Sequence, residues 1–111
     1  MMKGSKQSRF SDSVYELTSL IPKGKVTTYG ALAKAFGNPR AGRATGNALR
    51  ANPNPIVVPC HRVVKSDGSI GGYSGSGGSR TKERLLEKEG VVVVAGWVDL
   101  DRFLFTRFKS N

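Results

Sequence analysis

The only cysteine and the only histidine of this chain are neighbours, Cys60 and His61, in the run PCHRV. A thiol becomes nucleophilic as its thiolate, and a nearby histidine is the usual base that forms it. Neighbours on a strand point to opposite faces, so contact between the two side chains requires a turn, which Pro59 favours. The pair predicts nucleophilic catalysis; a small buried cysteine beside a satisfied core histidine stays open as the simpler interpretation.

Two other uses of this pair fit the sequence poorly. A structural zinc site takes four cysteine or histidine ligands, and the chain offers only two such residues. A redox pair needs a second cysteine, which the sequence lacks. We therefore expect no metal, no cofactor and a free thiol in a reducing compartment.

The charge of the chain predicts a polyanionic partner. Its 111 residues include 18 Lys and Arg against 8 Asp and Glu, a formal net charge of +10. Nucleic acid is the commonest partner of so basic a domain, with a merely soluble basic protein or a membrane-surface binder as alternatives. Without an apolar run that could cross a bilayer or act as a secretory signal, we expect an intracellular protein, cytoplasmic or, in a eukaryote, nuclear.

The elements that must position these residues are short, and one domain accommodates them all. We expect a flexible N-terminus over residues 1–9 and a single folded unit over residues 10–111. Apolar residues at intervals of three and four predict a helix from Ser11 to Ile21. A second helix is predicted over Tyr29–Phe36, and a third from Asn38 to about Ala51, which together form a helix-turn-helix pattern.

The second half of the chain alternates extended and helical patterns. Residues 56–58 predict a short buried strand or an extended segment that leads into PCHRV, and residues 69–79 predict a glycine-rich loop. Residues 81–89 predict a charged helix closed by Gly90, and residues 91–108 predict extended segments around Ala95-Gly96. The fold class is therefore α+β and mostly helical: a winged helix-turn-helix-like domain with short strands and the cysteine after the third helix.

One face of the third predicted helix is basic. Intervals of three, four and three place four polar residues within a narrow arc: Arg40, Arg43, Asn47 and Arg50. Small residues fill the adjoining arc, so this helix can approach a nucleic acid closely. An ordinary solvated face is the alternative, but no acidic residue is interleaved among these cations.

Four runs of this sequence, IPKGKVTTYG, RATGNALRANP, PCHRV and GGYSG, together resemble one known domain. It is the C-terminal active-site domain of the O6-alkylguanine-DNA alkyltransferases, and the resemblance extends from about Ser11 to Gly90. These repair proteins take an alkyl group from guanine O6 onto a cysteine in a single turnover. The resemblance implies direct reversal of DNA damage by a monomer whose partner is double-stranded DNA containing O6-alkylguanine.

The resemblance also implies roles for individual residues. Cys60 corresponds to the alkyl acceptor, His61 to the histidine that deprotonates it through a water, and Glu89 to the carboxylate that orients the histidine. Asn52 matches the asparagine of the turn between the reading helix and the active site. Tyr29 matches the tyrosine that assists base flipping and hydrogen-bonds the guanine.

Further positions are implied for DNA and for the flipped base. Arg43 matches the arginine that occupies the space left by the flipped nucleotide. The other positions expected to contact DNA are Arg40, Thr45, Gly46, Asn47 and Arg50. The positions expected to contact the guanine are Pro55, Val63, Tyr73 and Ser74.

A second reading comes from the tail AGWVDLDRF, which resembles that of the alkyltransferase-like proteins. Those single-domain proteins bind alkylated guanine without repairing it and recruit nucleotide excision repair proteins, which are expected partners only under this alternative. Their cysteine is replaced, commonly by tryptophan, so the presence of Cys60 favours transfer. A third class, which binds DNA through charge alone, leaves PCHRV unexplained.

Overall fold

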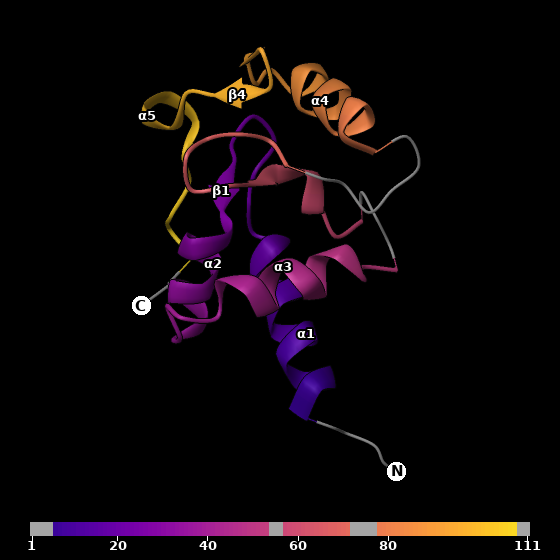
Figure 1. Cartoon of the computed structure of the whole chain (residues 1–111), viewed down its shortest axis with the longest axis vertical. Coiled ribbons are helices and arrows are strands. Elements are labelled where there is room, and N and C mark those ends of the chain that lie inside the picture. Colours follow the sequence, from indigo (N-terminus) through magenta and orange to yellow (C-terminus); the bar gives the residue numbers. More distant parts are fainter. Residues whose placement is uncertain (1–5, 54–56, 72–77, 109–111) are drawn as a thin grey trace.

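The computed structural model describes residues 6–53, 57–71 and 78–108. Figure 1 shows α1, α2 and α3 in one half of the molecule and α4, β4 and α5 in the other, with β1 between them. In chain order the elements are α1 (Lys6–Thr18), β1 (Thr27–Thr28), α2 (Tyr29–Phe36), α3 (Gly42–Arg50), the 3-10 helix η1 (Cys60–Arg62), β2 (Val63–Val64), α4 (Gly78–Lys88), β3 (Val93–Val94), β4 (Trp97–Val98) and α5 (Leu100–Phe103).

Helix α2 has the bounds that the sequence predicts, because both of its ends are capped. The Ala31 amide donates to Thr28 Oγ1 at 3.0 Å, which satisfies one of the free amides of the first turn. At the other end Gly37 takes a left-handed φ of 106° and donates to the carbonyls of Ala33 and Lys34.

The other two helices of this half begin at residues that differ from the prediction. Helix α1 starts at Lys6, within the segment expected to be flexible, and ends at Thr18. Helix α3 starts at Gly42 rather than at Asn38, because Asn38 forms a separate turn: its Oδ1 accepts from the Arg40 amide at 3.1 Å. Arg40 therefore precedes α3.

The buried strand or extended segment predicted before the cysteine is wrong at Val57, which lies in a turn and is 79% exposed, while Ile56 lies outside the described residues. The strand follows the cysteine instead, as β2, and pairs in parallel with β1. Between Pro59 and β2 the chain forms η1. The Val63 amide closes this short helix by donating to the Cys60 carbonyl.

The C-terminal half combines one long helix with a hairpin. Helix α4 begins three residues before the predicted start, and Gly90 follows it with a φ of 95°. The expected turn at Ala95-Gly96 joins the antiparallel strands β3 and β4, and both turn residues have positive φ. Residues 100–103, predicted to be extended, form the short helix α5.

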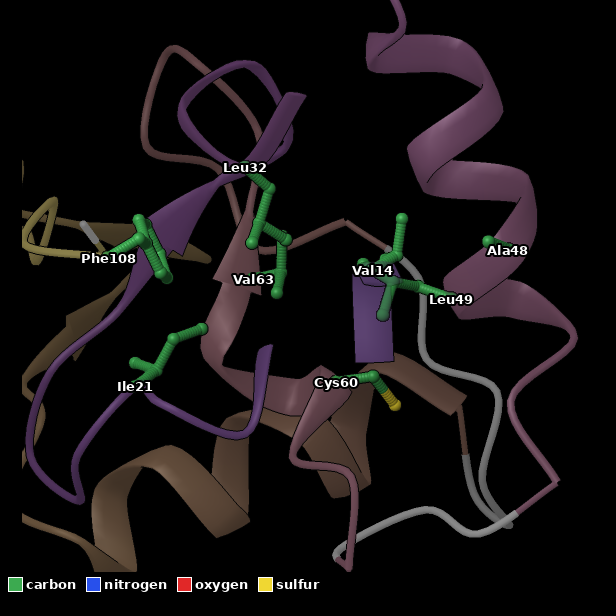
Figure 2. Close-up of a cluster of buried hydrophobic side chains, with 8 residues drawn as sticks. All are labelled: Val14, Ile21, Leu32, Ala48, Leu49, Cys60, Val63 and Phe108. Atoms are coloured by element: carbon green, nitrogen blue, oxygen red, sulfur yellow. The ribbon is translucent and has the colours of Figure 1, made fainter. Parts of the chain in front are cut away.

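Two hydrophobic clusters share the interior. The first cluster, drawn in Figure 2, consists of Val14, Ile21, Leu32, Ala48, Leu49, Cys60, Val63 and Phe108. The second cluster consists of Val26, Val64, Ile70, Leu86, Val91, Val93, Val98 and Phe103. Strand β2 contributes to both, since successive side chains of a strand point to opposite faces. Among the described residues, no helix is long and apolar enough to cross a bilayer.

Candidate active site and nucleic-acid interface

Cys60 opens η1 at the edge of the first cluster and is 6% exposed. The turn that Pro59 was expected to favour is present: the Arg62 amide donates to the Pro59 carbonyl at 2.9 Å. Figure 2 shows the sulfur pointing out of the cluster, away from Ile21 and Val63. Cys60 is nevertheless a buried member of the first cluster, so its thiol lies beneath the surface of the protein.

His61 is buried and is held by a carboxylate from the other half of the molecule. Its Nε2 lies 3.0 Å from Glu89 Oε2, and its Nδ1 is buried without a hydrogen-bond partner among the described residues. An ionised carboxylate only accepts hydrogen bonds, so this network assigns the proton to Nε2 and a lone pair to Nδ1. Nδ1 is therefore the His61 atom that can accept a proton from a thiol.

The protonation states of His61 and Glu89 are those of a base and of the carboxylate that orients it. Burial lowers the pKa of His61 below its ordinary value of 6.5, although the hydrogen bond with Glu89 acts in the opposite direction. Burial opposes ionisation of Glu89, but the hydrogen bonds from Arg62 and His61 prevail and lower its pKa. At neutral pH His61 is therefore a neutral base beside an ionised carboxylate.

Glu89 reaches His61 from 28 residues further along the chain, just beyond the end of α4. Helix α4 is anchored by Leu86, which is fully buried in the second cluster, and it packs against η1. Arg62 holds the same carboxylate: its Nε donates to Oε1 at 2.9 Å and its Nη2 to Oε2 at 2.7 Å. We did not single out Arg62 from the sequence, although it lies within PCHRV.

Lys82 is a second residue that sequence reasoning missed. It is fully buried, and its Nζ donates to the Val63 carbonyl at 2.7 Å and lies 5.9 Å from the centre of the Tyr29 ring. Burial lowers the pKa of Lys82 to about 8, although the Cys60 thiolate acts to raise it. Its spacing of four from Leu86 places it on the inward face of α4, which the sequence pattern could have revealed.

Tyr29 stands between α3 and the loop that follows β2. A Cβ at Gly46 would lie 3.8 Å from Tyr29 Cδ1, and a Cβ at Gly71 would lie 3.9 Å from the Tyr29 hydroxyl. Burial, reinforced by the nearby Cys60, raises the pKa of Tyr29. The phenol is therefore a neutral hydrogen-bond donor near the thiol.

Asn52 and Val63 shape the backbone on either side of the thiol. Asn52 is 5% exposed, and its Nδ2 donates to the Val58 carbonyl at 3.0 Å, which ties the end of α3 to the segment before Cys60. Val63 is fully buried, and its carbonyl already accepts from Lys82. A carbonyl has two lone pairs, so this contact leaves it able to accept a second donor.

The exposed side of α3 carries Arg43, Asn47 and Arg50, and Arg40 is exposed in the preceding turn. Thr45 is placed differently from our expectation: it is fully buried, and its hydroxyl donates to the Ala41 carbonyl at 2.7 Å. We therefore remove Thr45 from the DNA-facing set. The expected guanine contacts at Pro55, Tyr73 and Ser74 lie outside the described residues.

The described residues contain no cluster of three or more histidine, cysteine, aspartate or glutamate side chains that could hold a metal ion. The described residues bring five reactive or polar groups to this site: a thiol, a neutral imidazole, a carboxylate, a phenol and a buried ammonium. Together they are suited to nucleophilic attack by sulfur.

Comparison with known proteins shows which family this chain resembles. The family profile described as "6-O-methylguanine DNA methyltransferase, DNA binding domain" matches residues 9–91. The chain belongs to this family. The methylated-DNA–protein-cysteine methyltransferase of Rattus norvegicus is 49% identical over 86 residues, which make up 77% of this chain and 41% of the rat protein. The chain thus matches less than half the length of that relative.

Solved structures of methyltransferase-family relatives show the same fold. The Schizosaccharomyces pombe protein Atl1, in complex with damaged DNA containing O6-carboxymethylguanine, superimposes with a TM-score of 0.79 at 32% identity, covering 94% of this chain and 98% of Atl1. Mycobacterium tuberculosis OGT in complex with DNA gives a TM-score of 0.70 at 39% identity, covering 80% of this chain and 51% of OGT. The α+β fold class expected from the sequence is confirmed.

Proposed function

We propose that this chain reverses alkylation damage directly, by turning an O6-alkylguanine out of duplex DNA and transferring the alkyl group irreversibly to Cys60. The observation that carries the proposal is the 3.0 Å contact between His61 Nε2 and Glu89 Oε2, one residue from a cysteine that the chain retains. The protein acts as a monomer inside the cell on double-stranded DNA, without a cofactor.

The transfer balances with the groups of the site. The Cys60 thiol gives its proton to His61 Nδ1, directly or through a water, while Glu89 stabilises the imidazolium. The sulfur then attacks the alkyl carbon, so that a C–S bond forms as the C–O6 bond breaks and the electron pair stays on the guanine. The guanine takes up one proton from water, and the imidazolium of His61 returns the thiol proton to water. The thioether on Cys60 is permanent because a thioether does not hydrolyse.

Base flipping is required because stacking hides O6 inside the duplex. The exposed cations of α3 bind the DNA backbone, and Arg43 enters the space that the nucleotide leaves. Gly46 lets the backbone of α3 pack against Tyr29, since a Cβ there would already touch the ring at 3.8 Å. Tyr29 thus stands between the DNA-facing helix and the thiol, where it can crowd the displaced nucleotide.

A second candidate function is lesion sensing, in which the pocket holds the flipped base and the thiol stays unreacted. The similarity to Atl1, which is aligned over 98% of its length, favours this alternative. The arrangement of His61 and Glu89 beside Cys60 favours transfer, because a sensor needs neither an activated thiol nor an oriented base.

The decisive experiment is the intact mass of the protein after incubation with a duplex that carries one O6-methylguanine. Transfer predicts a gain of one methyl group, at no more than one per protein molecule, and none in Cys60→Ala. Binding of the same duplex by Cys60→Ala shows that the variant is folded. Tight binding without a mass change in the wild type would instead support the sensor and end the transfer proposal.

A further inference from the structure

The Arg62 guanidinium joins three parts of the molecule. Besides its two hydrogen bonds to the Glu89 carboxylate, its Nη1 donates to the Ile21 carbonyl at 2.7 Å. Ile21 lies between α1 and β1 in the first cluster, and Glu89 follows α4 in the other half. We propose that Arg62 is a positioning residue of the transfer reaction, which fixes Glu89 against His61 and thereby aims His61 Nδ1. This inference rests on the proposed function.

Glu89 needs such a clamp because only its backbone is fixed by α4: its amide donates to the carbonyls of Leu85 and Leu86 at 3.2 and 3.0 Å. It follows the last residue of α4, and Gly90 comes directly after it with a left-handed φ. A glutamate side chain has several freely rotating bonds, whereas the guanidinium fork matches both carboxylate oxygens at once. With Oε1 and Oε2 both occupied, the carboxylate plane is fixed, and the imidazole that donates to Oε2 is fixed with it.

Arg62 also sets the charge state in which this relay works. The charged groups that face His61 are Glu89, which favours the imidazolium, and Arg62 and Lys82, which disfavour it; Cys60 is the adjacent thiol. Without the Arg62 charge, the pKa of His61 rises, and the base stays protonated up to a higher pH. The pKa of Glu89 also rises, because its main ionising partner is lost.

A purely structural role for Arg62 makes a different prediction. The Ile21 contact alone would stabilise the fold, and its loss would lower the melting temperature without changing the chemistry of the folded protein. The positioning role predicts changes in the titration of His61 and in the transfer rate of the fraction that is folded. These two readouts separate the alternatives.

The sole histidine of the chain makes the first readout direct. The imidazole resonances of His61 are titrated by NMR in the DNA-free wild type and in Arg62→Gln, Arg62→Lys and Arg84→Gln. Arg84 lies on the exposed side of α4, so Arg84→Gln is the matched control for the loss of one positive charge. We expect the pKa of His61 to rise in Arg62→Gln, because the positive charge that lowers it is lost, and to stay unchanged in the other two.

The second readout is the first-order rate of methyl transfer at saturating O6-methylguanine duplex, measured across pH. In Arg62→Gln the acidic limb of the profile should move to higher pH with the His61 titration, which makes transfer slower on that limb. In Arg62→Lys the charge remains but a single ammonium cannot hold both oxygens. We therefore expect a lower rate without a shift of the profile.

An unchanged His61 titration and an unchanged pH profile in folded Arg62→Gln would overturn the inference. If Arg62→Gln does not fold, Arg62→Lys decides: a lower melting temperature with a wild-type transfer rate would make Arg62 structural only. A wild type that transfers nothing would end the proposed function, and with it the reaction that Arg62 is said to serve. The DNA-free titration would then still show whether Arg62 controls His61.

Discussion

The two halves of this molecule contribute different parts of the reactive centre. The half built from α1, α2 and α3 around the first cluster supplies Cys60 and the basic surface of α3. The half built from α4, the hairpin and α5 around the second cluster supplies Lys82 and Glu89. Strand β2 joins the clusters, because Val63 points into the first and Val64 into the second.

This division shows why the reactive centre lies where the two halves meet. A thiol in the first half becomes a nucleophile only when a carboxylate from the second half orients the base beside it. Changes to the basic surface of α3 in the first half should therefore affect DNA binding, whereas changes to the groups that orient the base should affect the rate of transfer. The following variants test this contrast in order of expected effect.

Among variants that keep the thiol, His61→Ala should have the largest effect on the rate of transfer. Loss of the base should slow methyl transfer by roughly 10²–10⁴-fold while DNA affinity stays at the wild-type level. Single-turnover transfer and fluorescence anisotropy on the same duplex measure the two quantities. Weaker DNA binding with an unchanged rate would show that His61 contributes to DNA binding and not to transfer.

A matched pair of core substitutions compares the halves directly. Leu32 lies in the first cluster and Leu86 in the second, and both are almost fully buried. Each change to alanine should lower the free energy of unfolding by about 2–5 kcal/mol, as measured in urea. Only Leu86→Ala should also slow transfer by the folded protein, because α4 positions Glu89; equal rates in both variants would contradict this.

The buried ammonium of Lys82 should make stability depend on alkaline pH. Burial lowers its pKa to about 8 in the folded protein, from the ordinary value of 10.5 that applies to the unfolded chain. Between these values the unfolded state binds more protons, so the free energy of unfolding should rise with pH across that window, by on the order of 2–3 kcal/mol. Urea denaturation at several pH values measures this rise, and a Lys82→Met variant should lose it.

Arg43→Ala should weaken binding to O6-methylguanine duplex by about tenfold, because a cation on the exposed side of α3 is lost. Arg107→Ala, at an exposed position of the C-terminal segment, is the control that removes the same charge elsewhere. Equal losses in the two variants would mean that DNA binding depends on net charge rather than on α3.

The smallest effect is expected from Thr45→Val. The hydroxyl of Thr45 is buried and bonded within its own half, so its loss should cost about 1 kcal/mol of stability and leave DNA affinity unchanged. A fall in affinity, measured by fluorescence anisotropy, would restore Thr45 to the DNA-facing set.

Local patterns in the sequence predicted the elements that local interactions control. Helix α2 has its predicted bounds because Thr28 and Gly37 are caps that act within one turn. The turn between β3 and β4 was likewise predictable, since Ala95-Gly96 separates the valine run at residues 91–94 from Trp97-Val98. The start of α3 was misplaced because the same Asn-Pro pair that can open a helix formed a separate turn here.

The sequence by itself determined the kinds of group present: one thiol beside one imidazole, a basic helix and no second cysteine. It also carried the family resemblance that assigned Glu89 to His61. Only the tertiary structure decided which residues the buried polar groups contact, as with the contact of Lys82 with the Val63 carbonyl and the two hydrogen bonds of Arg62 to Glu89. The physical reason is that periodicity reflects neighbours within one or two turns, whereas burial and ion pairing depend on segments far apart in the chain, here 27 residues for Arg62 and Glu89.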